Sequence, residues 1–431
     1  MVRENERGIT LIALVISIIL LLIFAGIMIA TLTGNNGILT RAQEAKFKTE
    51  EAQYKELLQL ELQGCLNNVG NINLEMLNDN LIKNIPNILI DGEKISKENQ
   101  ISKLPCMVSL NQYKYYILND GKILDVYNIA EIKNTAKTFS KNIAVEDIYG
   151  NIFVLPTGFK ITLDSADMVT GGIVIEDVNY ENTIGSQFVW IPIGDIKTED
   201  NQQDIVLNRY IFNEETGEEQ AQNDNIINDV FQELPKSDLG NIVAKDIEEF
   251  KSKTEEYNGY YIARYEARTD VKRNQKEDVL STLTVRVEDY VYNFVTQQQA
   301  AELSRGMYEN SEFTSDLVNS YAWDTAVLFL QKNDDREGNN KKYSLQGSSN
   351  IDSLAEKGTS KLEMPDVICN IYDMASNCFE WTTETSYSNM RACAAIGGYY
   401  GNEYYTPSRR RGNQVDYSFD FQSFRPIIYF K

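Results

Sequence analysis

The chain has 431 residues, more than one ordinary core accommodates, and its 42% hydrophobic and 24% charged residues are typical of folded globular proteins. Its formal net charge of −22 disfavours nucleic acids and anionic lipid headgroups as partners. The sequence has no histidine, which excludes Ser-His-Asp and Cys-His catalytic sites and histidine-ligated zinc, iron and copper.

Residues 9–32 form a long apolar run without charges. At about 1.5 Å per residue, a helix over this run would be roughly 36 Å long, enough to cross a bilayer. Arg3 and Arg7 precede it, and cations on that side favour a cytoplasmic N-terminus. We therefore expect a transmembrane helix, with the C-terminal part displayed outside the cell at the surface.

The junction between Gly8 and Ile9 resembles the class III leader of type IV prepilins and pseudopilins, over roughly the first sixty residues. The resemblance implies a leader at 1–8, cleavage between Gly8 and Ile9, methylation of the new N-terminus, and other pilin subunits as partners. Ala13 stands where this family usually has Glu, which favours a minor subunit at a pilus tip or a plain anchor. An uncleaved transmembrane anchor is the alternative.

Residues 9–64 are predicted to form the transmembrane and stalk helix. After the interruption at 34–37, apolar residues recur at helical spacing and predict one buried face. They are Tyr54, Leu57, Leu58, Leu62 and Cys65.

Residues 65–139 predict a small mixed α/β unit that resembles the small β-sheet following a pilin helix. A short helix is expected over 73–83, and Asn119-Asp120-Gly121 indicates a hairpin turn. Tyr115 and Tyr116 are expected to pack inside. From about residue 140 the composition becomes β-like, with exposed insertions expected at about 197–233 and 332–360.

Several segments after residue 187 follow one another in a characteristic order: 188–192 (FVWIP), 259–266 (GYYIARYE), 320–326 (SYAWDTA), 371–382 (IYDMASNCFEWT), 391–400 (RACAAIGGYY) and 423–426 (SFRP). This series resembles the formylglycine-generating-enzyme (sulfatase-modifying factor) family over 140–431. The resemblance implies a C-type-lectin-like domain. The predicted fold class is therefore α+β: a transmembrane and stalk helix, a small β-rich pilin-like unit and this C-terminal domain.

The family's oxidase activity requires copper held by two cysteines just after the Gly-Gly pair, which is Gly397-Gly398 here. The stretch 397–408 has no cysteine, and Cys393 stands alone before it. Because Cu(I) requires thiolate ligands, we expect no copper and a non-catalytic domain. An extracellular oxidase is the alternative from the enzyme class.

The C-terminal segment is rich in tyrosine, asparagine and arginine, which are typical of binding surfaces. The predicted ligand-binding residues are Tyr399, Tyr400, Asn402, Tyr404, Tyr405, Arg409, Arg410, Arg411, Asn413, Asp416 and Tyr417. The segment also resembles the variable regions of diversity-generating retroelement targets. We expect a pilin-like surface protein with a lectin-like head that recognises an extracellular protein or glycan. The alternatives are core packing by these aromatics and a structural minor pilin that primes filament assembly.

By the same family resemblance, Asp373, Ser376, Cys378 and Glu380 would hold Ca²⁺ through oxygen ligands. Ordinary turn and cap hydrogen bonds are the alternative role for these residues. Trp190, Trp323 and Trp381 are expected in the core. The five cysteines lack CxxC spacing, which favours free thiols, although a Cys369–Cys378 or Cys378–Cys393 bridge stays open.

Overall fold

The computed structural model describes residues 11–33, 37–67, 70–133, 135, 137–222, 226–227, 231–233, 246–336, 342–347, 354–359, 366–386, 393–402 and 404–431. The chain forms two compact units. The smaller one contains the described residues up to Gln100 together with Ser109–Tyr113, and the larger one contains Ile101–Val108 and Lys114–Lys431. The cleavage junction expected between Gly8 and Ile9 lies outside the described residues.

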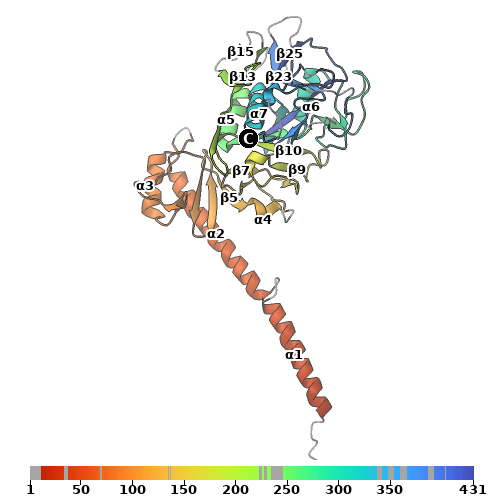
Figure 1. Cartoon of the computed structure of the whole chain (residues 1–431). Coiled ribbons are helices and arrows are strands. Elements are labelled where there is room, and N and C mark those ends of the chain that lie inside the picture. The colour runs from red at the N-terminus through yellow and green to blue at the C-terminus, as the bar shows by residue number, and fades with distance from the viewer. Residues whose placement is uncertain are drawn as a thin grey trace, which may run out of the picture. The chain divides into compact units, whose positions relative to one another are not determined.

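Helices occur in both units (Figure 1). In the described ranges they are α1 (Leu11–Thr33), α2 (Ile38–Gly64), α3 (Leu74–Asn84), α4 (Ile129–Lys133), α5 (Ile247–Tyr257), α6 (Gln297–Gly306) and α7 (Ser320–Lys332), with 3₁₀ turns η1 (Val169–Gly171) and η2 (Tyr343–Leu345).

The predicted transmembrane segment is the main correction to the expected fold. Apolar side chains of α1 are solvent-exposed, for example Val15 at 47% and Leu21 at 68%. Nevertheless, no helix within the described residues is long and apolar enough to cross a membrane. The expected transmembrane helix, and with it the location at the cell membrane, cell surface or pilus tip, is therefore wrong. In place of the predicted α+β class with a transmembrane stalk, the described chain has seven α-helices and many small sheets.

The smaller unit is built where α2 meets α3. Leu58, Leu62 and Cys65 are buried along one side of α2, as their spacing predicts, whereas Leu57 is 42% exposed. The predicted helix over 73–83 is confirmed as α3. The side chain of Asn73 caps its N-terminus by accepting a hydrogen bond from the Met76 N–H at 3.0 Å. This unit also contains a hairpin of β1 (Leu89–Ile90) and β2 (Glu93–Lys94).

Strands β3 (Cys106–Leu110) and β4 (Tyr113–Ile117) each contain residues assigned to both units. The predicted hairpin turn is confirmed, since β4 pairs antiparallel with β5 (Ile123–Asn128) through Ile117 and Ile123. Gly121 supplies the positive φ of 81° that the turn requires. β5 continues to β6 (Ile143–Glu146) and β7 (Ile152–Leu155), and Tyr115 and Tyr116 are buried as expected.

A six-stranded antiparallel sheet forms the centre of the larger unit. Its order is β20 (Phe313–Leu317), β27 (Pro426–Phe430), β17 (Gly259–Ala263), β10 (Gln187–Pro192), β9 (Val174–Asp177) and β8 (Phe159–Ile161). α5 and α7 pack on it (Figure 1). Phe250 of α5 contacts the Tyr260 ring at 5.4 Å, and the Tyr260 hydroxyl donates to the carbonyl of Ala322 in α7. Trp190, Trp323 and Trp381 are fully buried, which confirms their predicted role in the core.

A second sheet carries the C-terminal segments. Its order is β15 (Ile226–Ile227), β16 (Phe231–Gln232), β23 (Phe379–Ser386), β24 (Cys393–Ile396) and β25 (Arg410–Asn413), and β26 (Gln422–Phe424) pairs parallel with β23. The remaining strands form two-stranded antiparallel sheets: β11 (Gly194–Lys197) with β12 (Gln202–Ile205), β13 (Arg209–Phe212) with β14 (Glu219–Gln222), β18 (Arg268–Thr269) with β19 (Tyr290–Val291), and β21 (Val367–Ile368) with β22 (Ile371–Tyr372).

The segment expected as an exposed insertion at 197–233 is exposed at 199–202, 213–216 and 218–221, but its strand β13 contributes to the interior. Arg209, Tyr210 and Phe212 of β13 are buried. The Tyr210 N–H donates to the Asp324 carboxylate of α7 at 2.8 Å. The acidic and amide-rich composition that suggested a loop therefore surrounds a short strand that packs on α7.

Candidate binding site

The loop that follows β24 is held close to the turn at 373–377. The Gly398 N–H donates to the Met374 carbonyl at 3.2 Å. A Cβ atom at Gly398 would lie 2.0 Å from the Ala375 carbonyl oxygen, and Gly397 has a φ of 92°. Only glycine permits this approach, so the Gly397-Gly398 pair sets where the tyrosine-rich loop begins.

Arg410, which was predicted to bind ligand, is instead a buried structural residue. Its side chain is 3% exposed and forms ion pairs with Asp324 at 2.6 Å and Glu384 at 2.9 Å. Arg209 pairs with Glu384 from the other side at 2.5 Å. Burial alone would raise the pKa of Glu384, but the Arg410 and Arg209 guanidinium groups hold that pKa below its usual value. We call these four side chains the buried ion network.

Tyr399, Tyr405 and Tyr417 lie together around Phe379, in a cluster that we call the aromatic platform. Tyr399 stacks on Phe379 at 4.6 Å between ring centroids, and Tyr405 meets the same ring edge-on at 4.7 Å. The Arg411 guanidinium lies over the rings of Phe379 and Tyr417, at 5.4 and 5.6 Å. These predicted binding residues are half-buried, so each side chain packs against the protein with one part and is exposed to solvent with the other.

Other predicted residues project from the platform into solvent. Tyr404 is 72% exposed. Arg409 is exposed and lies over the Tyr405 ring at 5.5 Å. Asp416 is exposed in the loop after β25, and Asn402 accepts a hydrogen bond from the Tyr404 N–H at 2.9 Å. Asn413, in contrast, is 3% exposed and belongs to the interior.

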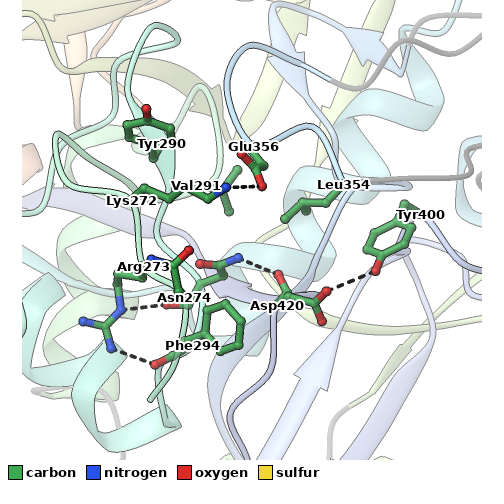
Figure 2. A pocket seen from close by; sticks show the side chains of 11 residues that line it. Lys272, Arg273, Asn274, Tyr290, Val291, Phe294, Leu354, Glu356, Tyr400 and Asp420 are labelled. Carbon is green, nitrogen blue, oxygen red and sulfur yellow. Dashed lines mark hydrogen bonds and ion pairs between the residues drawn. The ribbon is translucent and has the colours of Figure 1, made fainter. Parts of the chain in front are cut away.

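Tyr400 connects this surface to a cleft of about 370 Å³ (Figure 2). Its walls come from segments 272–274, 290–294 and 354–356 together with Tyr400 and Asp420. The Tyr400 hydroxyl donates to the Asp420 carboxylate at 3.3 Å. Burial, and then the neighbouring Asp420 charge, raises the pKa of Tyr400, so its phenol is a neutral donor at physiological pH.

One cleft wall holds a backbone conformation that is unfavourable for its residue. Phe294 has a φ of 54°, in the left-handed region that a bulky side chain rarely adopts. The Phe294 N–H donates to the Phe419 carbonyl at 3.1 Å, which holds it in place. Non-glycine residues in this region cost about 1–3 kcal/mol and concentrate at binding and active sites.

The proposed calcium ligands are engaged with protein groups. The carboxylate of Glu380 pairs with Arg425 at 2.6 Å, and Asp373 accepts a hydrogen bond from the Ser376 hydroxyl at 3.1 Å. The Cys378 N–H donates to Glu266 at 2.9 Å. Across the described ranges, no group of three or more His, Cys, Asp or Glu side chains is placed to hold a metal ion. The calcium site stays a prediction.

The cysteines do not form the bridge considered between residues 369 and 378, because Cys369 and Cys378 are free thiols. Burial raises the pKa of both thiols far above the ordinary value, so neither is a thiolate at neutral pH. The side chain of Cys393 lies outside the described residues.

The sequence did not predict most of the residues that line the cleft. Lys272, Arg273, Tyr290, Phe294 and Glu356 come from segments far from the tyrosine-rich loop, and their backbone conformations carry no sequence signal. Asp420 could have been found, because it stands between Phe419 and Phe421 at the end of the predicted binding segment.

No protein-family model matches the chain, and no curated protein matches it.

Proposed function

We propose that the protein is a non-catalytic recognition protein, and that it binds a protein or glycan ligand through the surface around Tyr404. The observation that carries this proposal is a 72% exposed tyrosine, Tyr404, next in the chain to Tyr405 of the half-buried aromatic platform. Exposed large aromatics that form part of a cluster are typical of binding surfaces, whereas isolated apolar side chains on a surface need no explanation.

The fixed ends of the tyrosine-rich loop support the same proposal. The loop at 397–409 starts at the Gly397-Gly398 contact and ends at Arg410, which is part of the buried ion network. A loop held at both ends loses little conformational entropy when a ligand binds, so more of the contact energy contributes to affinity. Tyr404 in turn contributes large contact area with few internal degrees of freedom.

The lack of any cysteine in 397–408 favours a binding role over an oxidase role, since Cu(I) requires thiolate ligands. The proposal also agrees with diversification of this segment by a retroelement. Substitutions at exposed positions such as Tyr404 and Asp416 leave the core packing untouched.

The test is selection of ligands from a random peptide display library and from a glycan array, using the full-length protein. Tyr404→Ser should weaken binding of the selected ligands by about tenfold or more, as expected for an interface aromatic. Leu163→Ser is the matched control, because Leu163 is 78% exposed in the same unit and lies on a different strand connection. Ligands that bind equally well to the Tyr404→Ser protein, or a failure to select any ligand, would refute the proposal.

A further inference from the structure

We infer that the cleft beside the tyrosine-rich loop binds a cationic side chain, lysine or arginine, of the ligand, with Asp420 as its counter-ion. This inference rests on the proposed function and names the chemistry of part of its ligand. The charged groups of the cleft differ in the hydrogen-bonding capacity that they retain.

Arg273 cannot serve a ligand, because its guanidinium group is already saturated. The side chain is 2% exposed. An arginine has five N–H donors. Here they are directed at five backbone carbonyls of the surrounding loops, at 2.7 to 3.4 Å: those of Lys276, Asp278, Val279, Asn293 and Phe294. An anionic ligand would therefore find no available donor on this residue.

The charges at the opposite end of the cleft are also engaged. Lys272 pairs with Glu356 at 2.6 Å. The ammonium group of Lys357 lies over the Tyr290 ring at 3.9 Å, so that aromatic face is already covered by a cation. In Figure 2, Lys272, Tyr290 and Glu356 lie on one side of the cleft and Tyr400 and Asp420 on the other.

Asp420 is the charged group with spare capacity. Its carboxylate accepts one hydrogen bond from the Phe421 N–H at 3.1 Å and one from the Tyr400 hydroxyl at 3.3 Å. Two carboxylate oxygens offer about four acceptor positions, so about two remain. Across the described ranges, no lysine or arginine forms an ion pair with it. A half-buried carboxylate of this kind attracts a cation that can also donate hydrogen bonds.

The surroundings of Asp420 suit an organic cation. The rings of Phe294 and Tyr400 line the same cleft (Figure 2), and a guanidinium or ammonium group gains from contact with aromatic faces. The net charge of −22 adds a long-range attraction for basic ligands. A volume of about 370 Å³ is ample for one long side chain with part of its backbone.

The test titrates the full-length protein with Nα-acetyl-arginine methylamide and Nα-acetyl-lysine methylamide, observed by ligand-detected NMR. The neutral analogues of citrulline and norleucine are the chemical controls. We expect binding of at least one cationic probe and a loss of about tenfold or more in Asp420→Asn, which removes the charge and keeps one of the two acceptor oxygens that Phe421 and Tyr400 use. Glu309→Gln is the matched control, because Glu309 is an exposed carboxylate of the same unit that does not line the cleft, and it should change affinity less than threefold.

Equal binding of the citrulline analogue, unchanged affinity in Asp420→Asn, or no binding of either cationic probe would overturn the inference. So would selection of neutral glycans whose binding survives Asp420→Asn but not Tyr400→Ala. The proposed function would still stand in those cases if the selected ligands depend on Tyr404. Urea unfolding of each variant, followed by tryptophan fluorescence, checks that the fold is retained.

Discussion

Replacing Arg410 by alanine tests whether the buried ion network holds the C-terminal strands in place. Arg410 is the partner of both Asp324 and Glu384, and its side chain is 3% exposed. After its removal Glu384 keeps only Arg209, and Asp324 faces no cation from β25. Breaking a buried ion pair on one side destabilises a protein by about 3–5 kcal/mol. We therefore expect Arg410→Ala to lower the free energy of unfolding by about that amount.

Urea unfolding followed by tryptophan fluorescence is the suitable assay, because all three tryptophans are buried in the larger unit. Arg409→Ala is the matched control. Arg409 is the adjacent residue, but it is exposed and should cost less than about 1 kcal/mol. Similar losses in the two variants would refute the assignment of Arg410 to the interior.

The pH dependence of the stability loss in Arg410→Ala provides a second test of the buried ion network. Burial raises the pKa of Asp324 to about 6, even though Arg410 opposes the shift. Without Arg410 this pKa should rise further, so Asp324 can be neutralised by a proton in mildly acidic solution. The loss of stability in Arg410→Ala should therefore be smaller at about pH 5 than at about pH 8. A loss that is the same at both pH values would contradict the proposed cause.

Three other predictions concern single residues. Burial, and then the Glu384 charge, raises the pKa of Glu233 from 4.5 to about 7. The folded state then holds a proton that the unfolded chain releases, so this group should lower stability by about 3 kcal/mol as pH rises from about 5 to 8, and Glu233→Gln should flatten that slope in urea titrations. Gly398→Ala should cost about 3 kcal/mol, because its Cβ would lie 2.0 Å from the Ala375 oxygen, whereas Gly306→Ala, with nothing within 4 Å, should be neutral or stabilising by less than about 1 kcal/mol. Asn73→Ala should cost about 1 kcal/mol by removing the α3 cap, measured by thermal unfolding followed by circular dichroism.

Local features of the fold could be predicted, since their causes are local. The Asn73 cap and the Asn119-Asp120-Gly121 turn each depend on a few consecutive residues, and both occur in the structure. The length and apolarity of the run at 9–32 led to the prediction of a transmembrane helix, which is wrong, because no helix within the described residues is long and apolar enough to cross a membrane.

The site could be predicted only in part, because its contacts join distant segments. Arg209 and Glu384 are 175 positions apart, and nothing in the sequence pairs them. The arginine run at 409–411 was treated as one surface, yet Arg409 precedes β25 and is exposed. The side chain of Arg410, the first residue of β25, is held in the interior by Asp324 and Glu384.

The hydrogen bonds that Arg273 donates to the surrounding backbone carbonyls have a practical consequence for protein engineering. Three of these carbonyls belong to the stretch at 274–279, and the Asp278 carboxylate in turn accepts hydrogen bonds from the Asn274 and Gln275 N–H groups. The shape of the stretch therefore depends on Arg273 and Asp278, and less on its other side chains. Foreign peptides of equal length that keep Asp278 are expected to adopt this conformation when they are grafted there.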